Sequence, residues 1–498
     1  MDINLVIVVT SLLAMLALGI WSGRGTKTIR EFAVDNGNVS AAALFATIVA
    51  TYVGGVQGLA EKTFTVGIIF PLLCGVGGCI QLLTVGILIA PRMERFLGSA
   101  ISPGGMSYIF WGRAGEIITG VAGVLCSLGS VAVQVCAIGF LFQGCLGISY
   151  FGGVTLGCGV FILYSAFGGI RAVLVTDSIQ FLGVVVAVPV LAYLAVMNAG
   201  GLDTILNTVP EKHLSLVSLW EQPLKYVPVL ITWILWMLNP AWIQRLLMGR
   251  GVSQLRVAFC FSAVVCFSII LCPICIGFSA LATSPNIDPN IAVMYVIQTA
   301  APAGLQGLII AGLLAVIMST VDSDLNITSV MMICDVVVPC KKRVLTDGQI
   351  LRYARYGSFG LGLASIVVAL YFRNIIDVIL YFDSFWIGTV VIPLIASVFG
   401  YKSTQQAFIW AAGIGVLTIL LWTVFRLEAR FNIYGLFPSM VINATVFFGL
   451  NEYGRRCGVF EREEKARQAK REKILAEREQ MHRLGHHYLP EEDLEPLH

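Results

Sequence analysis

The chain contains a series of apolar segments that are each long enough to cross a lipid bilayer as a helix. A membrane-spanning helix needs about 20 predominantly apolar residues. Only 12% of the residues are charged, whereas a soluble domain carries about 25%. The chain is therefore predicted to be an all-α polytopic membrane protein with thirteen transmembrane helices, at 3–22, 39–60, 66–90, 116–146, 148–167, 173–197, 226–248, 256–282, 304–334, 355–373, 375–400, 405–425 and 433–451.

The basic residues predict how these helices are oriented. Lysine and arginine concentrate in the cytoplasmic connections of membrane proteins. Sixteen of them follow the odd-numbered helices, Arg245 among them, against six in the alternate connections. The first apolar segment has neither the basic start nor the cleavage site of a secretory signal, so we expect it to be a retained helix. The charge bias predicts that its N-terminus lies outside the cell. Thirteen crossings then place the C-terminus in the cytoplasm.

The segment 312–326 is apolar at both ends but polar in its middle. Carboxylates at membrane depth cost roughly 3 kcal/mol each on insertion scales and usually mark a path for an ion or a solute. Hydroxyl and carboxylate oxygens are hard ligands that suit a small hard cation. The polar side chains in the middle of this segment are Ser319, Thr320, Asp322, Ser323 and Asp324.

Two other helices carry sequence signals for an interruption. Gly54 and Gly55 weaken the second helix, and Pro240 breaks the backbone ladder of the seventh. In transporters, interrupted helices expose backbone carbonyls at mid-membrane, and a spacing of five helices is expected from two inverted repeats. The glycines could instead permit close helix packing, and Pro240 could be an ordinary kink.

Asp177 lies about one turn inside the sixth helix, after Arg171 at its edge. The carboxylate could pair with a basic residue, or it could complete a cation site with the ninth helix. The residues alone leave both readings open.

Three of these motifs resemble the sodium:solute symporter family. They are Phe167–Gln180, Ala315–Asn326 and the Ala50–Gly55 break, and the resemblance covers roughly residues 1–450. It implies a leucine-transporter-type fold, with one helix before a ten-helix core of two inverted five-helix repeats and two helices after it. The implied division is 1–38, first helix and loop; 39–225, repeat one; 226–404, repeat two; 405–454, two peripheral helices; and 455–498, a charged cytoplasmic tail helix.

The resemblance also implies a coupling sodium ion between the second and ninth helices. By motif position its ligands are the hydroxyls of Ser319 and Thr320, with the carbonyls of Val316, Ile48 and Thr51. Some family members hold another sodium beside the first, and the matching positions are Asp177, Ser319, Asp322 and Ser323. An aspartate at 322 stands where serine is usual, so it could strengthen cation binding or carry a proton.

For the solute, the sequence is similar to choline-type carriers in its Thr51–Gly55 run. A quaternary ammonium group is recognised by aromatic rings. The expected solute-binding residues are Tyr52, Gly54, Gln57, Gln134, Trp236, Asn239, Trp242 and Asp324, with Trp233 as a further aromatic wall.

The sequence therefore predicts a sodium-coupled symporter that moves a small organic solute, such as an amine, a choline-like cation or an amino acid, into the cell by alternating access. We expect it in the cell (inner) membrane, in contact with lipid, as a monomer or a homodimer. The net charge of +3 gives no sign of a nucleic-acid partner, and no enzyme motif is evident. The alternatives are a proton-coupled carrier that uses Asp177 or Asp322, a channel, and a transporter-like solute sensor.

Overall fold

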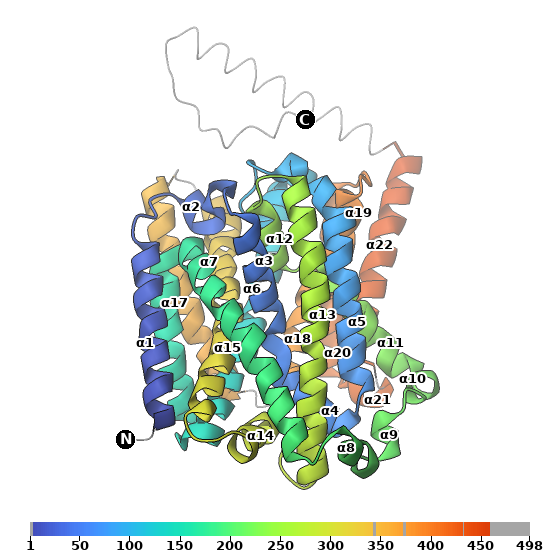
Figure 1. The fold of residues 1–498 in the computed structure, drawn as a ribbon. Helices are drawn as coiled ribbons and strands as arrows, with labels where there is room; N and C mark the ends of the chain where they lie inside the picture. Colours follow the sequence, from blue (N-terminus) through green and yellow to red (C-terminus); the bar gives the residue numbers. More distant parts are fainter. Residues whose placement is uncertain (1–2, 342–344, 372–374, 432, 459–498) are drawn as a thin grey trace.

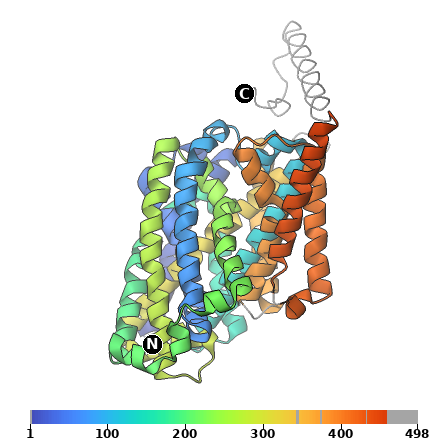
Figure 2. The same ribbon diagram turned by 90° about the vertical axis from the view of Figure 1, so that its right-hand side faces the viewer.

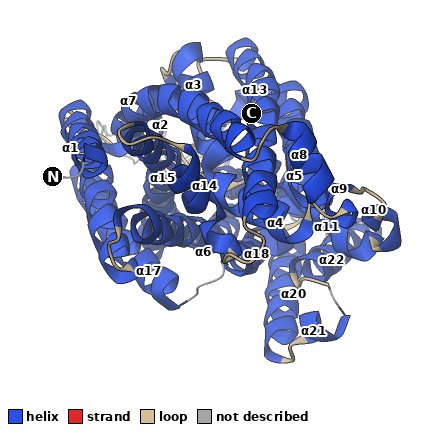
Figure 3. Ribbon diagram, turned by 60° about the horizontal axis from the view of Figure 1, so that its bottom comes forward, coloured by secondary structure: helices blue, strands red, loops and turns tan. Residues whose placement is uncertain are grey.

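The computed structural model describes residues 3–341, 345–371, 375–431 and 433–458. Every regular element within these ranges is a helix, and they contain no strand (Figure 3). The predicted all-α architecture is thus confirmed. The tail helix expected within 455–498 falls almost entirely outside the described residues.

The body of the molecule is a bundle of long helices, some of which are interrupted and continue as a second helix. Its helices are α1 (Ile3–Gly23), α3 (Ala41–Tyr52), α4 (Val56–Val66), α5 (Ile69–Thr84), α6 (Pro103–Leu146), α7 (Tyr150–Asn198), α11 (Pro223–Leu235), α12 (Pro240–Leu247), α13 (Val252–Thr283), α15 (Leu305–Val330), α17 (Asp347–Tyr371), α18 (Ile375–Trp386), α19 (Ile392–Val398), α20 (Gln405–Val424) and α22 (Leu436–Arg456). Short helices in the connections are α2 (Ile29–Val34), α8 (Leu202–Thr208), α9 (Glu211–Leu214), α10 (Ser218–Glu221), α14 (Ala292–Ala300), α16 (Val338–Cys340) and α21 (Leu427–Phe431).

Eleven helical segments of the described chain are long and apolar enough to cross a membrane. The other two expected spans are also helices. The span expected at 148–167 appears as a shorter apolar helix, Tyr150–Leu163, at the start of α7. The span expected at 433–451 is α22, in which Asn443 and Asn451 dilute the apolar sequence.

Two of the long helices bend at a glycine. Gly112 in α6 has φ 62° and Gly169 in α7 has φ 60°. This left-handed conformation costs glycine little, whereas a side chain would strain it. The bend at Gly169 divides α7 into two arms, which correspond to the fifth and sixth expected helices.

Both predicted interruptions are present. A short 3₁₀ turn, Val53–Gly55, separates α3 from α4. A second 3₁₀ turn, Trp236–Leu238, ends α11, and α12 then begins with Pro240 in its first turn. Asn239 caps α12, because its side-chain oxygen accepts a hydrogen bond from the Ala241 amide at 2.9 Å.

The middle of the bundle is occupied by α15, which is buried continuously from Gly312 to Val330. It packs against α7, α6, α1, α17 and α3. The last helices, α20 and α22, pack on each other at one edge of the bundle, where they add to its width (Figure 2).

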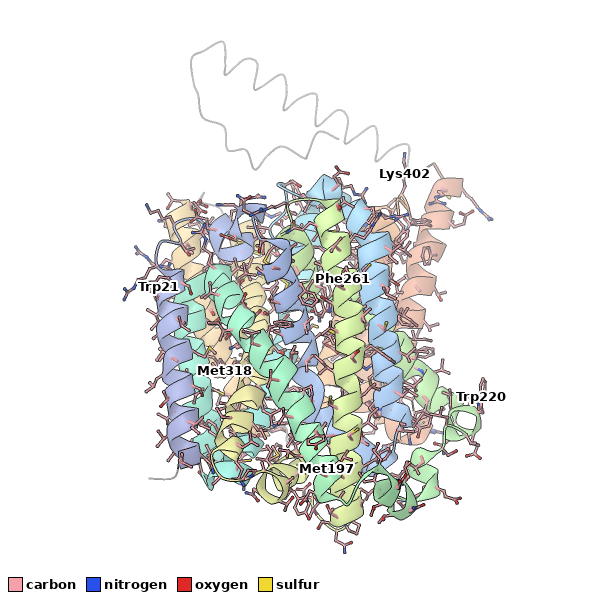
Figure 4. The ribbon with its side chains drawn as sticks, viewed as in Figure 1. Trp21, Met197, Trp220, Phe261, Met318 and Lys402 are labelled. Carbon is pink, nitrogen blue, oxygen red and sulfur yellow. The ribbon has the colours of Figure 1, made fainter. Side chains whose placement is uncertain are left out.

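The bundle has an apolar outer surface and a buried core. Phe261 on α13 is 65% exposed, and Trp21 on α1 is also exposed, whereas Met318 on α15 is 2% exposed (Figure 4). An exposed belt of large apolar side chains is what a lipid environment favours.

The two ends of the described chain lie at opposite ends of the bundle (Figure 1). The start of α1 shares its end with α8, α9, α10 and α14, and α22 finishes at the other end, near Lys402 (Figures 1 and 4). An odd number of crossings produces this arrangement. Which end faces the cytoplasm remains a prediction from the basic residues.

Candidate functional site

The first part of the site lies where α15 meets the end of α3. The Ser319 hydroxyl donates to the Ala50 carbonyl at 2.9 Å and to Val316 at 2.8 Å, and the Thr320 hydroxyl donates to the Thr51 carbonyl at 3.1 Å. The last carbonyls of a helix have no partner within it, so the end of α3 makes such oxygens available. We call this group, made by Ala50, Thr51, Val316, Ser319 and Thr320, the hydroxyl–carbonyl cluster.

The hydroxyl–carbonyl cluster brings together most of the oxygens expected for sodium. Ile48, the other expected ligand, is buried on α3, whereas the α3 carbonyls that accept from the two hydroxyls are those of Ala50 and Thr51. All these oxygens are neutral, hard donors, which suit a sodium ion. The assignment of individual ligands stays a prediction.

Gly54 explains how α15 can approach the break so closely. A Cβ at this position would lie 2.2 Å from the Thr320 hydroxyl oxygen, which no real contact allows. Gly78 on α5 plays a similar part for Tyr52, because a Cβ there would overlap the phenol oxygen at 1.2 Å.

The second part of the site surrounds Asp177. This fully buried carboxylate accepts a hydrogen bond from Thr47 and lies 3.8 Å from the guanidinium of Arg245, which is also fully buried. Arg245 in turn contacts Thr51 and Ser323. We call Thr47, Thr51, Asp177, Arg245 and Ser323 the arginine cluster. Asp322, which directly precedes Ser323 in the chain, is also fully buried.

The place of Arg245 corrects one interpretation of the sequence. The count of basic residues assigned Arg245 to a cytoplasmic connection, but the structure buries it in α12. The short helix after the break turns this side chain inward. The bias among the remaining basic residues, fifteen against six, still supports the same orientation.

The third part of the site is a cavity between the two interrupted helices. Its walls include Tyr52, Gly54, Gln57, Gln134 and Trp236 of the expected solute-binding residues, and also Trp233. The Gln57 amide, the Gln134 amide oxygen and the Tyr52 hydroxyl are buried without a hydrogen-bond partner among the described residues. Buried polar atoms are normally bonded, so these atoms are available to a solute.

The other three expected solute-binding residues lie behind the cavity wall. Trp242 packs against Tyr52 with ring centroids 6.3 Å apart. Asn239 caps α12 and approaches the Cys126 sulfur at 3.8 Å. Asp324 accepts a hydrogen bond from Ser130, which itself lines the cavity.

The cavity also contains polar residues that the sequence analysis did not select. Asp383 lines it, is 4% exposed and accepts a hydrogen bond from Cys126 at 3.3 Å. Thr232 and Ser130 are further lining residues. A carboxylate within the apolar stretch 375–400, which holds Asp377 and Asp383, was the available signal, of the same kind as that at Asp177.

Comparisons with known proteins show that the chain is similar in sequence to transporters. The chain is 24% identical over 345 residues to a sodium/proline symporter of Staphylococcus aureus, a match that covers 65% of this chain and 66% of the relative. It is 20% identical over 318 residues to an osmoregulated proline transporter of Bacillus subtilis (strain 168), covering 61% of this chain and 64% of that one. The matched part therefore spans slightly less than two thirds of each relative.

Solved structures of similar fold are also transporters. A substrate-bound, outward-open Na⁺-coupled sialic acid symporter superposes with a TM-score of 0.75 at 18% identity, covering 91% of this chain and 98% of the other. A nucleobase-cation-symport-1 family transporter in a closed conformation gives a TM-score of 0.56 at 12% identity, covering 85% and 95%. These likenesses support the leucine-transporter-type fold. The family model for sodium:solute symporters matches residues 32–415, and the chain thus belongs to the sodium:solute symporter family.

Proposed function

We propose that the protein is a sodium-coupled symporter that carries a small, positively charged organic solute into the cell by alternating access. The observation that carries this proposal is the junction of α15 with the α3 break. The hydroxyls of Ser319 and Thr320 face backbone carbonyls there, directly beside a cavity with unpartnered polar atoms.

Sodium would bind at the hydroxyl–carbonyl cluster. The hydroxyls would turn their lone pairs toward the ion, and the ion would join α15 to the end of α3. This junction belongs to both repeats, so occupancy there would favour one arrangement of the repeats. Each positive charge that moves inward gains about 2.3 kcal/mol per 100 mV of membrane potential.

The cavity supports a cationic solute. Tyr52, Trp233 and Trp236 form a continuous aromatic wall, with centroid distances of 6.2 Å and 5.6 Å between successive rings. Aromatic faces attract ammonium groups. Asp383 adds a buried carboxylate to the same cavity, and a buried charge is stable there only when it is paired.

Gln57 and Gln134 would then bind the polar remainder of the solute. Their amides offer donors and acceptors, which suit a hydroxyl or a carboxylate on the same molecule. A small amine, a quaternary ammonium compound or an amino acid satisfies both halves of this cavity.

The test combines ligand binding with transport. Purified protein is melted in sodium or potassium buffer with a panel of amines, amino acids, sugars and carboxylates, because a ligand that binds the folded state raises its melting temperature. We expect a solute-induced shift that requires sodium and favours cations, and sodium-driven uptake of that solute into proteoliposomes.

A matched substitution tests the solute class. Asp383→Asn should lower the affinity for a cationic solute by about tenfold or more, because a hydrogen bond to a charged group contributes about 1.5–3 kcal/mol. The sodium-dependent shift without solute should persist. Unchanged affinity for the cation would contradict the solute class, and a shift that follows pH but ignores sodium would favour proton coupling.

A further inference from the structure

Arg245 occupies the position at which family resemblance implies a second sodium ion. The side chain is fully buried on α12, and its neighbours are the carboxylate of Asp177 and the hydroxyl of Ser323, both expected ligands of that ion. Together with the proposed sodium-coupled function, on which this inference rests, these contacts determine how many ions the transporter uses.

The contacts of one guanidinium nitrogen resemble the coordination shell of a cation. Nη2 lies 2.5 Å from the Thr51 hydroxyl oxygen, 2.6 Å from that of Ser323 and 3.0 Å from that of Thr47. The Asp177 carboxylate is 3.8 Å away, and Thr47 also donates to it. Three hydroxyls and one carboxylate therefore converge on a positive charge that the chain itself supplies.

The guanidinium is held in this position by its own helix and a neighbouring ring. Nη1 donates to the Ala241 carbonyl at 3.1 Å, and the guanidinium carbon lies 5.4 Å from the centroid of the Trp242 ring. A guanidinium keeps its charge at any physiological pH. It therefore acts as a permanent occupant.

We propose that Arg245 replaces the second sodium ion, so that this transporter couples its solute to a single sodium ion. The guanidinium already contacts the hydroxyls of Thr47, Thr51 and Ser323, so a metal ion placed among the same hydroxyls would meet it at contact distance. Like charges at that separation repel strongly in a buried site. The residues of the expected second site therefore do not fit a further sodium ion while Arg245 is in place.

The same contacts join the arginine cluster to the hydroxyl–carbonyl cluster. Thr51 belongs to both, because its hydroxyl contacts Arg245 while its carbonyl accepts from Thr320 at 3.1 Å. Arg245 thus positions the end of α3, where the single sodium ion would bind.

The experiment counts sodium ions bound to the purified full-length protein, by equilibrium dialysis against radioactive sodium in potassium buffer. We expect one ion in the wild type. R245Q, which removes the charge but retains N–H donors, should bind two sodium ions, because Asp177 and the hydroxyls become available. R245K, which keeps the charge, should bind one, and so should the double variant D177N/R245Q.

Two ions in the wild type, or one ion in folded R245Q, would overturn the proposal. If R245Q does not fold, the wild type and the double variant decide. A count of one in both supports the built-in cation, and a fall from two to one contradicts it. A count of zero in the wild type would overturn sodium coupling itself, so the two failures are distinguishable.

Discussion

The hydroxyl–carbonyl cluster and the arginine cluster use the same kinds of oxygen, one helical turn apart on α15, yet they differ in charge. Ser319 and Ser323 are four residues apart and share a helix face. The Ser319 hydroxyl donates to the neutral carbonyls of Ala50 and Val316, whereas the Ser323 hydroxyl contacts a guanidinium that lies near Asp177. A polar cluster in a membrane helix is therefore open to an external cation only where the chain has not supplied its own.

The comparison predicts that the arginine cluster is the more sensitive of the two to a lost charge. Asp177→Asn should lower the free energy of unfolding by about 3–5 kcal/mol, because it leaves the guanidinium buried without its carboxylate. Thermal unfolding in detergent measures the effect. Glu94→Gln, at an exposed carboxylate, is the control and should change little. Equal melting temperatures for both variants would remove the distinction between the clusters.

The hydroxyl–carbonyl cluster should respond in sodium affinity rather than in stability. Ser319→Ala and Thr320→Ala should each raise the sodium concentration for half-maximal thermal shift by about tenfold or more, because each removes an oxygen that would contact the ion. Ser329→Ala removes a buried hydroxyl from the same helix, one bonded to the Asn326 carbonyl at 2.8 Å, and should leave that concentration unchanged. Unchanged sodium dependence in both test variants would exclude this cluster as the ion site.

The close approach at the break gives a third prediction. Gly54→Ala should cost about 1–3 kcal/mol and weaken sodium binding, because the added Cβ displaces Thr320. Gly413→Ala on α20 is the matched control, since nothing lies within 4 Å of a Cβ there. Melting curves at several sodium concentrations compare the two, and a G54A curve that resembles that of G413A would show that the break tolerates a wider separation.

The smallest effect concerns His213, in the connection between α7 and α11 and outside both clusters. Burial lowers the pKa of His213 below its usual value, and Lys212 nearby acts in the same direction. The folded state therefore disfavours the charged imidazole, and its stability should fall slightly as pH drops below the ordinary histidine pKa of about 6.5 and through the lowered value. Melting temperatures across this range should flatten in His213→Gln. An unchanged slope would assign the pH dependence to another group.

The sequence predicted the two helix interruptions correctly because each has a local cause. Gly54, Gly55 and Pro240 interrupt their helices through backbone conformation, which depends on neighbours in the chain. The assignment of Ser319 and Thr320 to an ion site stays a prediction, which rests on the rarity of hydroxyls beside carboxylates within an apolar helix. The structure brings Gly54 and Thr320 together at the junction of α15 with the break.

Other parts of the site could not be predicted from local patterns. Asp383 lies far along the chain from the breaks, and only the packing of α18 places it in the cavity with Trp233 and Trp236. Conversely, Trp242 and Asn239 have the chemistry expected of solute ligands but lie behind the wall, where Trp242 on α12 packs against Tyr52 and Asn239, the cap of α12, approaches Cys126.

By itself the sequence determined that this protein is a membrane bundle with two broken helices and a polar centre, because apolar length, glycine, proline and buried charge act through short-range rules. The tertiary structure decided which oxygens face an ion and which face a side chain. That decision depends on Arg245, which the sequence places after an apolar helix and the fold turns into the bundle beside Asp177. The distance between the charges of Arg245 and Asp177 is set by the packing of α3, α7, α12 and α15, and no local pattern encodes it.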